Sequence, residues 1–106
     1  MIESRRKLQT ALEAVLGSNH VYFQPPESIR LVYPCFVYEF DNLETRYGNN
    51  RLYKMMDRYT ITHIYERISD SNLVDDILDL PYAAFDRTFI SDNLYHDVYT
   101  IYTLHE

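Results

Sequence analysis

The chain has 106 residues, with 16 acidic and 10 basic side chains, and its formal net charge is −6. This length accommodates a single domain, residues 1–106, and the 46% hydrophobic content suffices for one core, which excludes wholesale disorder. No apolar run approaches the roughly 20 residues that cross a bilayer, and no secretory signal is visible, so we expect no membrane partner. The acidic balance argues against a dedicated DNA- or RNA-binding protein, which would carry a basic surface.

The charge is distributed unevenly along the chain. Residues 1–65 hold 7 acids and 8 bases, whereas residues 66–106 hold 9 acids and 2 bases. Such a block is usually a solvated face, but a fixed asymmetry can also orient a docking surface or repel a polyanion. The lone cysteine, Cys35, cannot form an intrachain disulfide, which suits a reducing cytosol.

The first half of the chain predicts a helix followed by extended segments. Residues 2–16 carry apolar side chains at the i, i+3, i+4 spacing of an amphipathic helix, and Gly17 is placed to end it. A short extended piece at 21–23 and a strand at 33–40 follow, the strand having one buried face. Residues 41–52 have the most loop-like composition of the chain, and we expect a long loop there.

The second half predicts a strand, a short helix and a final hairpin. Residues 53–65 are rich in β-branched and aromatic side chains, which is typical of a strand. Residues 69–71 offer N-cap candidates for a helix that reaches Leu80 and ends at Pro81. Two further strands, 84–90 and 94–104, are joined by a tight-turn composition.

This order of elements indicates the fold class. Strands that arrive in pairs through short turns favour an α+β domain with a largely antiparallel β-sheet. We expect the N-terminal helix and the second short helix to pack on one face of that sheet.

No catalytic, cofactor-binding or metal-binding residue is assigned. Because Gly17 and Gly48 are the only glycines, neither a dinucleotide-binding nor a P-loop pattern can exist. Cys35 is best interpreted as a small buried hydrophobe. His96 and Asp97 are neighbours on a strand and therefore point to opposite faces, so they cannot act as a base and its orienting group. The four histidines lack metal-ligand spacing; they are His20, His63, His96 and His105.

Eleven tyrosines are more than a small core should absorb. Tyrosine combines a large apolar area with a polar tip, which suits half-exposed positions and protein interfaces. Ordinary sheet packing accounts for about half of them, and we expect some of the others to face another subunit.

Several landmarks follow one another along the chain after the N-terminal helix. They are Tyr22-Phe23-Gln24-Pro25-Pro26, Tyr33-Pro34-Cys35-Phe36-Val37-Tyr38, Arg58-Tyr59-Thr60-Ile61-Thr62, Ser69-Asp70-Ser71, Phe85-Asp86-Arg87 and Asp92-Asn93-Leu94-Tyr95-His96-Asp97-Val98-Tyr99. Their order resembles the tail completion, tail terminator or head–tail joining (neck) proteins of long-tailed bacteriophages. The resemblance covers nearly the whole chain, although its motifs are structural and not chemical.

The resemblance implies a structural virion protein of the tail or neck, assembled in the host cytoplasm and without enzymatic activity. Such proteins form hexameric rings that end growth of the tail tube, contact the tail tube protein and the head connector or stopper protein, and let DNA pass without specific binding. Candidate contacts between subunits or with partners are Arg46, Tyr47, Asn49, Arg51, Tyr53, Asp86 and Arg87. Candidate residues of an acidic lumen or rim are Asp70, Asp75, Asp76 and Asp79.

Two alternatives stay open at this point. One is a different small structural or protein-interaction module, such as a connector-side adaptor, a capsid-associated protein or an antitoxin-like protein. The other is an enzyme of an unrecognised type.

Overall fold

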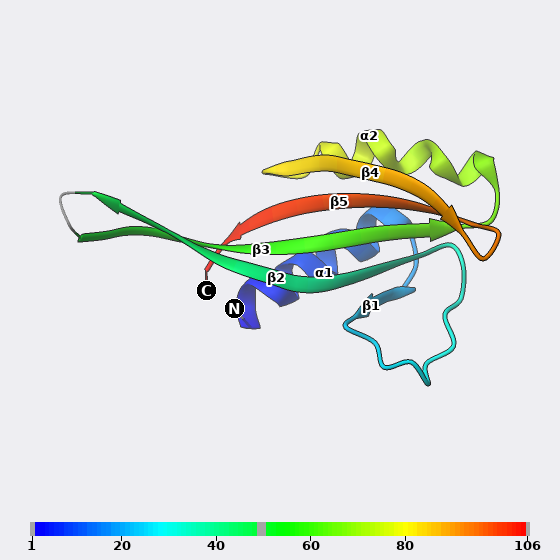
Figure 1. Cartoon of the computed structure of the whole chain (residues 1–106), viewed down its shortest axis with the longest axis horizontal. Helices are drawn as coiled ribbons and strands as arrows, with labels where there is room; N and C mark the ends of the chain where they lie inside the picture. The colour runs from blue at the N-terminus through cyan, green and yellow to red at the C-terminus, as the bar shows by residue number, and fades with distance from the viewer. Residues whose placement is uncertain (1, 49–50, 106) are drawn as a thin grey trace.

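Five strands form one sheet in the order β1-β2-β3-β5-β4, and two helices cover one of its faces (Figure 1). The computed structural model describes residues 2–48 and 51–105, with the side chains of 46–48, 51–54 and 71 left undescribed. In chain order the elements are α1 (Ile2–Leu16), β1 (Val21–Phe23), β2 (Cys35–Gly48), β3 (Arg51–Tyr65), the 3₁₀ helix η1 (Ile68–Leu73), α2 (Val74–Leu78), β4 (Ala83–Ser91) and β5 (Leu94–Leu104).

The pairing of the strands confirms the predicted fold class. β1 pairs in parallel with β2, and the other three neighbouring pairs are antiparallel. The chain is therefore an α+β protein with a largely antiparallel sheet, as the alternation of paired strands and helices predicts.

Helix α1 forms where the apolar periodicity predicts it. Leu8 and Leu12, one helical turn apart, are buried against the sheet. Gly17 follows the helix with φ of 77°, and its N–H donates to the carbonyl oxygen of Glu13 at 2.9 Å. A left-handed residue at this position satisfies a carbonyl that the helix end would leave without a partner, and glycine adopts that conformation at little cost.

The core lies between the helices and one face of the sheet, here called the helical face. Alternate residues of each central strand point into it, which the two-residue period of a strand requires. Its largest fully buried side chains are three tyrosines, Tyr38, Tyr59 and Tyr99. Helix α2 contributes Ile77, so both helices share one core with the sheet. The other side of the sheet is called the open face below.

The predicted loop at 41–52 is wrong, because the described residues of this segment, 41–48 and 51–52, belong to two long paired strands. β2 and β3 stay paired from Asn42 opposite Arg58 to Gly48 opposite Arg51. Residues with loop-like propensity form strands here because they have cross-strand partners, and pairing of this kind outweighs the weak intrinsic preference of a residue.

The distal part of this hairpin extends beyond the rest of the sheet, and we call residues 41–48 and 51–55 the arm. β1 reaches β2 only as far as Tyr38, and β5 reaches β3 only as far as Met56. Five residues of β3 thus project about 16 Å past β5, at roughly 3.3 Å per residue. The arm leaves the body along the long axis of the molecule, at the left of Figure 1, and the molecule measures 50 × 28 × 24 Å.

The second helix is shorter than predicted, and its expected N-cap is wrong. Residues 69–71 lie inside η1, where the N–H of Asp70 donates to the carbonyl oxygen of Arg67. The 3₁₀ bonds use N–H groups that a capping side chain would otherwise take. α2 therefore begins only at Val74, and Leu73, at its N-cap, makes no side-chain capping bond.

The turn between β4 and β5 forms as predicted. Asp92 and Asn93 have φ of 54° and 62°, and Ser91 pairs with Leu94 on either side of them. Two consecutive left-handed residues make the type I′ turn whose twist matches that of the flanking strands. β4 then forms one edge of the sheet.

Candidate functional site

The predicted contact residues divide between the arm and β4. Arg46, Tyr47, Arg51 and Tyr53 belong to the arm, close to the end of the hairpin. The side chains of these four, and the whole of Asn49, lie outside the described residues. Their backbone positions place them on the part of the chain that projects farthest from the body.

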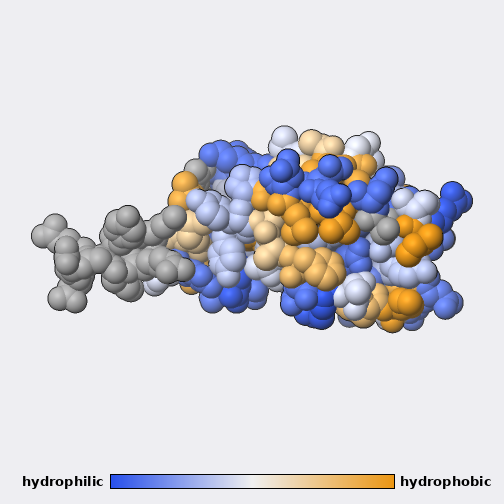
Figure 2. Space-filling model, turned by 90° about the horizontal axis from the view of Figure 1, so that it is seen from above, coloured by the Kyte–Doolittle hydropathy of each residue, from blue (hydrophilic) through white to orange (hydrophobic). Residues whose placement is uncertain are grey.

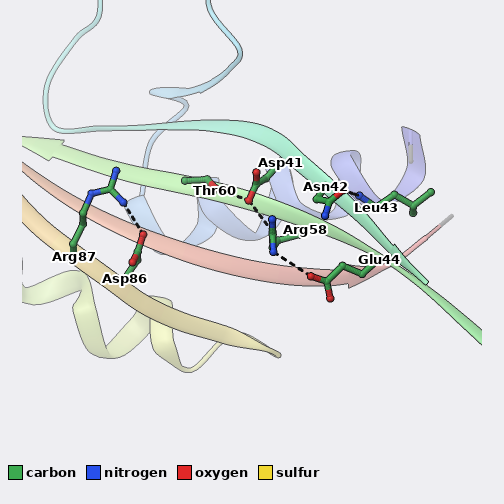
Figure 3. A network of polar contacts seen from close by, with 8 residues as sticks. All are labelled: Asp41, Asn42, Leu43, Glu44, Arg58, Thr60, Asp86 and Arg87. Carbon is green, nitrogen blue, oxygen red and sulfur yellow. Dashed lines mark hydrogen bonds and ion pairs between the residues drawn. The ribbon is translucent and has the colours of Figure 1, made fainter. Parts of the chain in front are cut away.

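Asp86 and Arg87 lie on the exposed edge strand β4. Arg87 Nη1 donates to Asp86 Oδ2 at 2.8 Å, and Figure 3 shows the two side chains pointing toward each other. Their side chains are 48% and 63% exposed, so the pair contributes little to stability. Between Phe85 and Arg87 the register with β5 shifts by one residue, which marks a β-bulge.

Apolar side chains also lie exposed along β4. Phe85, Phe89 and Ile90 are all exposed, Ile90 at 68%. Figure 2, seen from the side on which α2 and β4 lie in Figure 1, shows hydrophobic side chains grouped together and bordered by hydrophilic ones. β4 thus has the mixed apolar and charged surface of an edge that either meets a partner or is protected from one.

A charge network at the base of the arm escaped prediction from the sequence. On the open face Arg58 donates through Nε to Asp41 at 2.7 Å and through Nη1 to Glu44 at 3.1 Å (Figure 3). Hydrogen bonds to Tyr102 and then to Asp41 raise the pKa of Arg58 above its usual value. Acidic side chains of its own hairpin therefore already bind Arg58.

The four acidic residues predicted for a lumen or rim do not form one cluster. Asp75, Asp76 and Asp79 are exposed on or just after α2. Asp70 lies apart from them in η1, where it lines a polar hollow with Glu66 and Arg67. Asp76 and Asp79, in contrast, line a hollow with side chains of α1.

That hollow adjoins a largely apolar depression. It has a volume of about 280 Å³ and lies between α1, the segment Leu80–Tyr82 and the end of β5. Its lining includes Leu8 and Ile101. The pocket is lined by residues from both ends of the sequence, so no local sequence motif predicts it.

A buried polar network lies at one end of the pocket. Ser4 Oγ donates to Asp57 Oδ2 at 2.7 Å and lies 3.0 Å from the hydroxyl of Tyr59. His105 Nδ1 lies 2.8 Å from the other oxygen of the fully buried Asp57. The carboxylate sits between the serine and the imidazole, and this is not the order in which a histidine base activates a nucleophile. The contacts instead tie α1 and the C-terminal residues to β3.

A second buried polar group lies at the far end of the helical face. Asp97 is buried and accepts hydrogen bonds from Tyr65 at 2.9 Å and from Thr88 at 2.7 Å. His63, its partner in the register of β3 and β5, is fully buried, and neither ring nitrogen has a hydrogen-bond partner. Burial lowers the pKa of His63 to about 4. His96 stacks on Phe89, on the opposite face from Asp97, as the strand period predicts.

Other reactive groups are held in unreactive states. Cys35 is fully buried, and burial raises the pKa of its thiol to about 12. Burial also raises the pKa of Tyr99 to about 12.

Within the described residues, no three side chains of the metal-ligating types gather, and no helix is both long enough and apolar enough to cross a membrane.

Comparison with models of known protein families finds no match, and comparison with curated proteins finds none either.

Proposed function

We propose that this protein is a structural subunit of the neck of a long-tailed bacteriophage. In this role it forms a ring at the head-proximal end of the tail, ends growth of the tail tube and joins the tail to the head connector. The observation that carries the proposal is the arm, a two-stranded ribbon that projects about 16 Å past β5.

A projecting ribbon of this kind supports a role in assembly. A two-stranded ribbon that leaves its sheet has no layer of its own protein packed on it, so a surface on another subunit best accounts for it. The arm and the surfaces around α2 and β4 differ in shape and charge. Contacts between two different surfaces are heterologous, and they close into a ring when the rotation between subunits permits.

The acidic side chains of α2 suit a ring through which DNA passes. Asp75, Asp76 and Asp79 are exposed. Tight non-specific binding of DNA comes from neutralisation of its phosphates by basic side chains, and an acidic wall does the opposite. Placed along the channel or its rim, those of these carboxylates that no neighbouring subunit neutralises let DNA move without holding it.

Mass measurement and electron microscopy test the proposal. We expect size-exclusion chromatography with light scattering to give a mass several times 12.7 kDa, with rings in negative stain, alone or after addition of purified tail tubes. Binding to isolated head connectors but not to tubes would instead identify a connector-side adaptor. A monomer that binds neither tubes nor connectors would contradict the proposal.

A shortened arm provides the matched control. Removal of residues 45–47 and 52–55, which face each other across the hairpin with Tyr53 at a register shift, leaves Glu44 opposite Met56 and keeps residues 48–51 between the strands. This variant should stay folded, because the buried core lies outside the removed residues. We expect it to remain monomeric under conditions in which the complete chain assembles.

A further inference from the structure

A groove runs between α1 and the segment that contains α2 and Leu80–Tyr82. It consists of two adjoining hollows of about 280 and 410 Å³, and both are lined by Ala11 and Leu80. The first hollow has an apolar floor to which Leu8 and Ile101 contribute. The second is bordered by Ala14 of α1 and by acidic side chains of the α2 segment. A hollow of this size and polarity holds one or two large side chains of a partner.

The charge on the groove is concentrated at one end. Asp76 and Asp79 line the second hollow and are exposed, and no basic side chain among the described residues lines that hollow. Lys7 lines the first hollow, at the other end. A partner that places apolar groups on the floor and basic groups beside α2 would complement the groove.

The arm of another copy supplies the basic groups. Residues 46–54 contain three basic residues, Arg46, Arg51 and Lys54, and no acidic one. Their backbone forms the paired end of β2 and β3, which projects away from the body (Figure 1). The arm therefore carries its positive charge outward to a neighbour, whereas α2 presents negative charge on the body.

We propose that the groove between α1 and α2 receives the arm of a second copy of this chain, with Asp76 and Asp79 opposite its basic residues. The contact rests on the proposed function, since it is the head-to-tail interface that such a ring requires. It is heterologous, because the arm of one subunit meets the groove of the next.

The edge strand β4 fits the arm less well. Its bulge interrupts regular pairing, and the charged pair Asp86–Arg87 stands at that point. Bulges and charges of this kind protect an edge from the addition of another strand. The groove is not a strand edge, and its acidic side chains complement the basic residues of the arm instead of opposing them.

Charge reversal tests the pairing of the two surfaces. Asp76→Lys with Asp79→Lys, or Arg46→Glu with Arg51→Glu, should each weaken self-association about ten-fold, because each replaces attraction by repulsion. Asp75→Lys with Glu39→Lys changes the net charge by the same amount as the first pair, on exposed residues that do not line the groove, and should leave the association unchanged. An equal mixture of the two reversed proteins should restore part of the lost affinity. Equal weakening by all three double variants would overturn the proposal.

Disulfide trapping detects the contact between the arm and the groove even when association is weak. One protein carries Asn49→Cys, between the two strands of the arm in the sequence, and a second carries Ala14→Cys, in the lining of the groove. The control carries Glu39→Cys, exposed on the open face. The native Cys35 is buried and stays unreactive. We expect the arm thiol to crosslink to the Ala14→Cys protein at least about five times faster than to the Glu39→Cys protein, since proximity raises effective concentration.

The outcomes separate the contact from the function. Rings without preferential crosslinking would overturn the groove contact and leave the proposed function standing. Preferential crosslinking in an open chain of subunits would support the contact and contradict the closed ring. No rings, no binding to tubes and no preference in crosslinking would overturn both.

Discussion

Replacement of the buried His63 by phenylalanine should make the protein less sensitive to acid. The imidazole is fully buried, with its centroid 5.1 Å from that of Phe36 and 4.6 Å from that of Tyr65. Both ring nitrogens lack a hydrogen-bond partner, so the site tolerates an uncharged ring better than a charged one. Burial lowers the pKa of His63 from 6.5 to about 4, although the carboxylates of Asp97 and Asp70 favour the proton.

The sign and size of the effect follow from linkage. Between pH 6.5 and pH 4 the unfolded chain binds a proton at this residue and the folded chain does not, so stability is lost as the pH falls through this window. The difference in pKa corresponds to about 3 kcal/mol in total, and about 2 kcal/mol of this is lost between about pH 7 and pH 5.

Urea unfolding at about pH 7, 6 and 5 and constant ionic strength measures the effect. The free energy of unfolding should fall with pH by about 2 kcal/mol less in His63→Phe than in the wild type. His20→Phe, at a partly exposed position, should keep the wild-type slope because His63 is intact. If His63→Phe and the wild type lose stability in parallel, the imidazole titrates in the folded protein as it does in the unfolded chain, and the reasoning fails.

Three further outcomes follow from the packing. Leu12→Ala, at a fully buried position of α1, should lower the free energy of unfolding by about 2–5 kcal/mol, as measured by urea unfolding. A loss below about 1 kcal/mol would mean that α1 does not pack on the sheet as described. Asn93→Gly should raise the melting temperature, because φ of 62° suits glycine in a type I′ turn; a lower melting temperature would argue against that turn. The thiol of Cys35 should react with a chromogenic disulfide reagent only after unfolding, since burial raises its pKa to about 12, and rapid reaction in buffer would show it to be accessible.

Local patterns in the sequence predicted most of the fold. The periodicity of residues 2–16 defines α1, and Gly17 marks its end because a left-handed residue there favours glycine. Asp92 and Asn93 predicted the last turn for the same reason. Each of these signals is contained in a few neighbouring residues.

The arm and the groove could not be predicted in this way. Asp41 and Glu44 look like loop residues until Arg58, distant in the sequence, is placed on the neighbouring strand. The groove likewise depends on Ala11 and Leu80 lying side by side. Features of this kind depend on contacts between residues that are distant in the sequence, whereas a sequence pattern depends on residues that are close in the sequence.

The continuity of β2 and β3 through the body and the arm affects the entropy of any contact made at the end of the arm. Both strands already hold extended backbone geometry and cross-strand bonds beyond the core. A loop of the same length would lose about 1–2 kcal/mol per residue in conformational entropy when a partner ordered it. The two strands lose this conformational entropy when the subunit folds, so the arm is already ordered when it meets a neighbour. A contact of modest area can therefore be strong enough to persist.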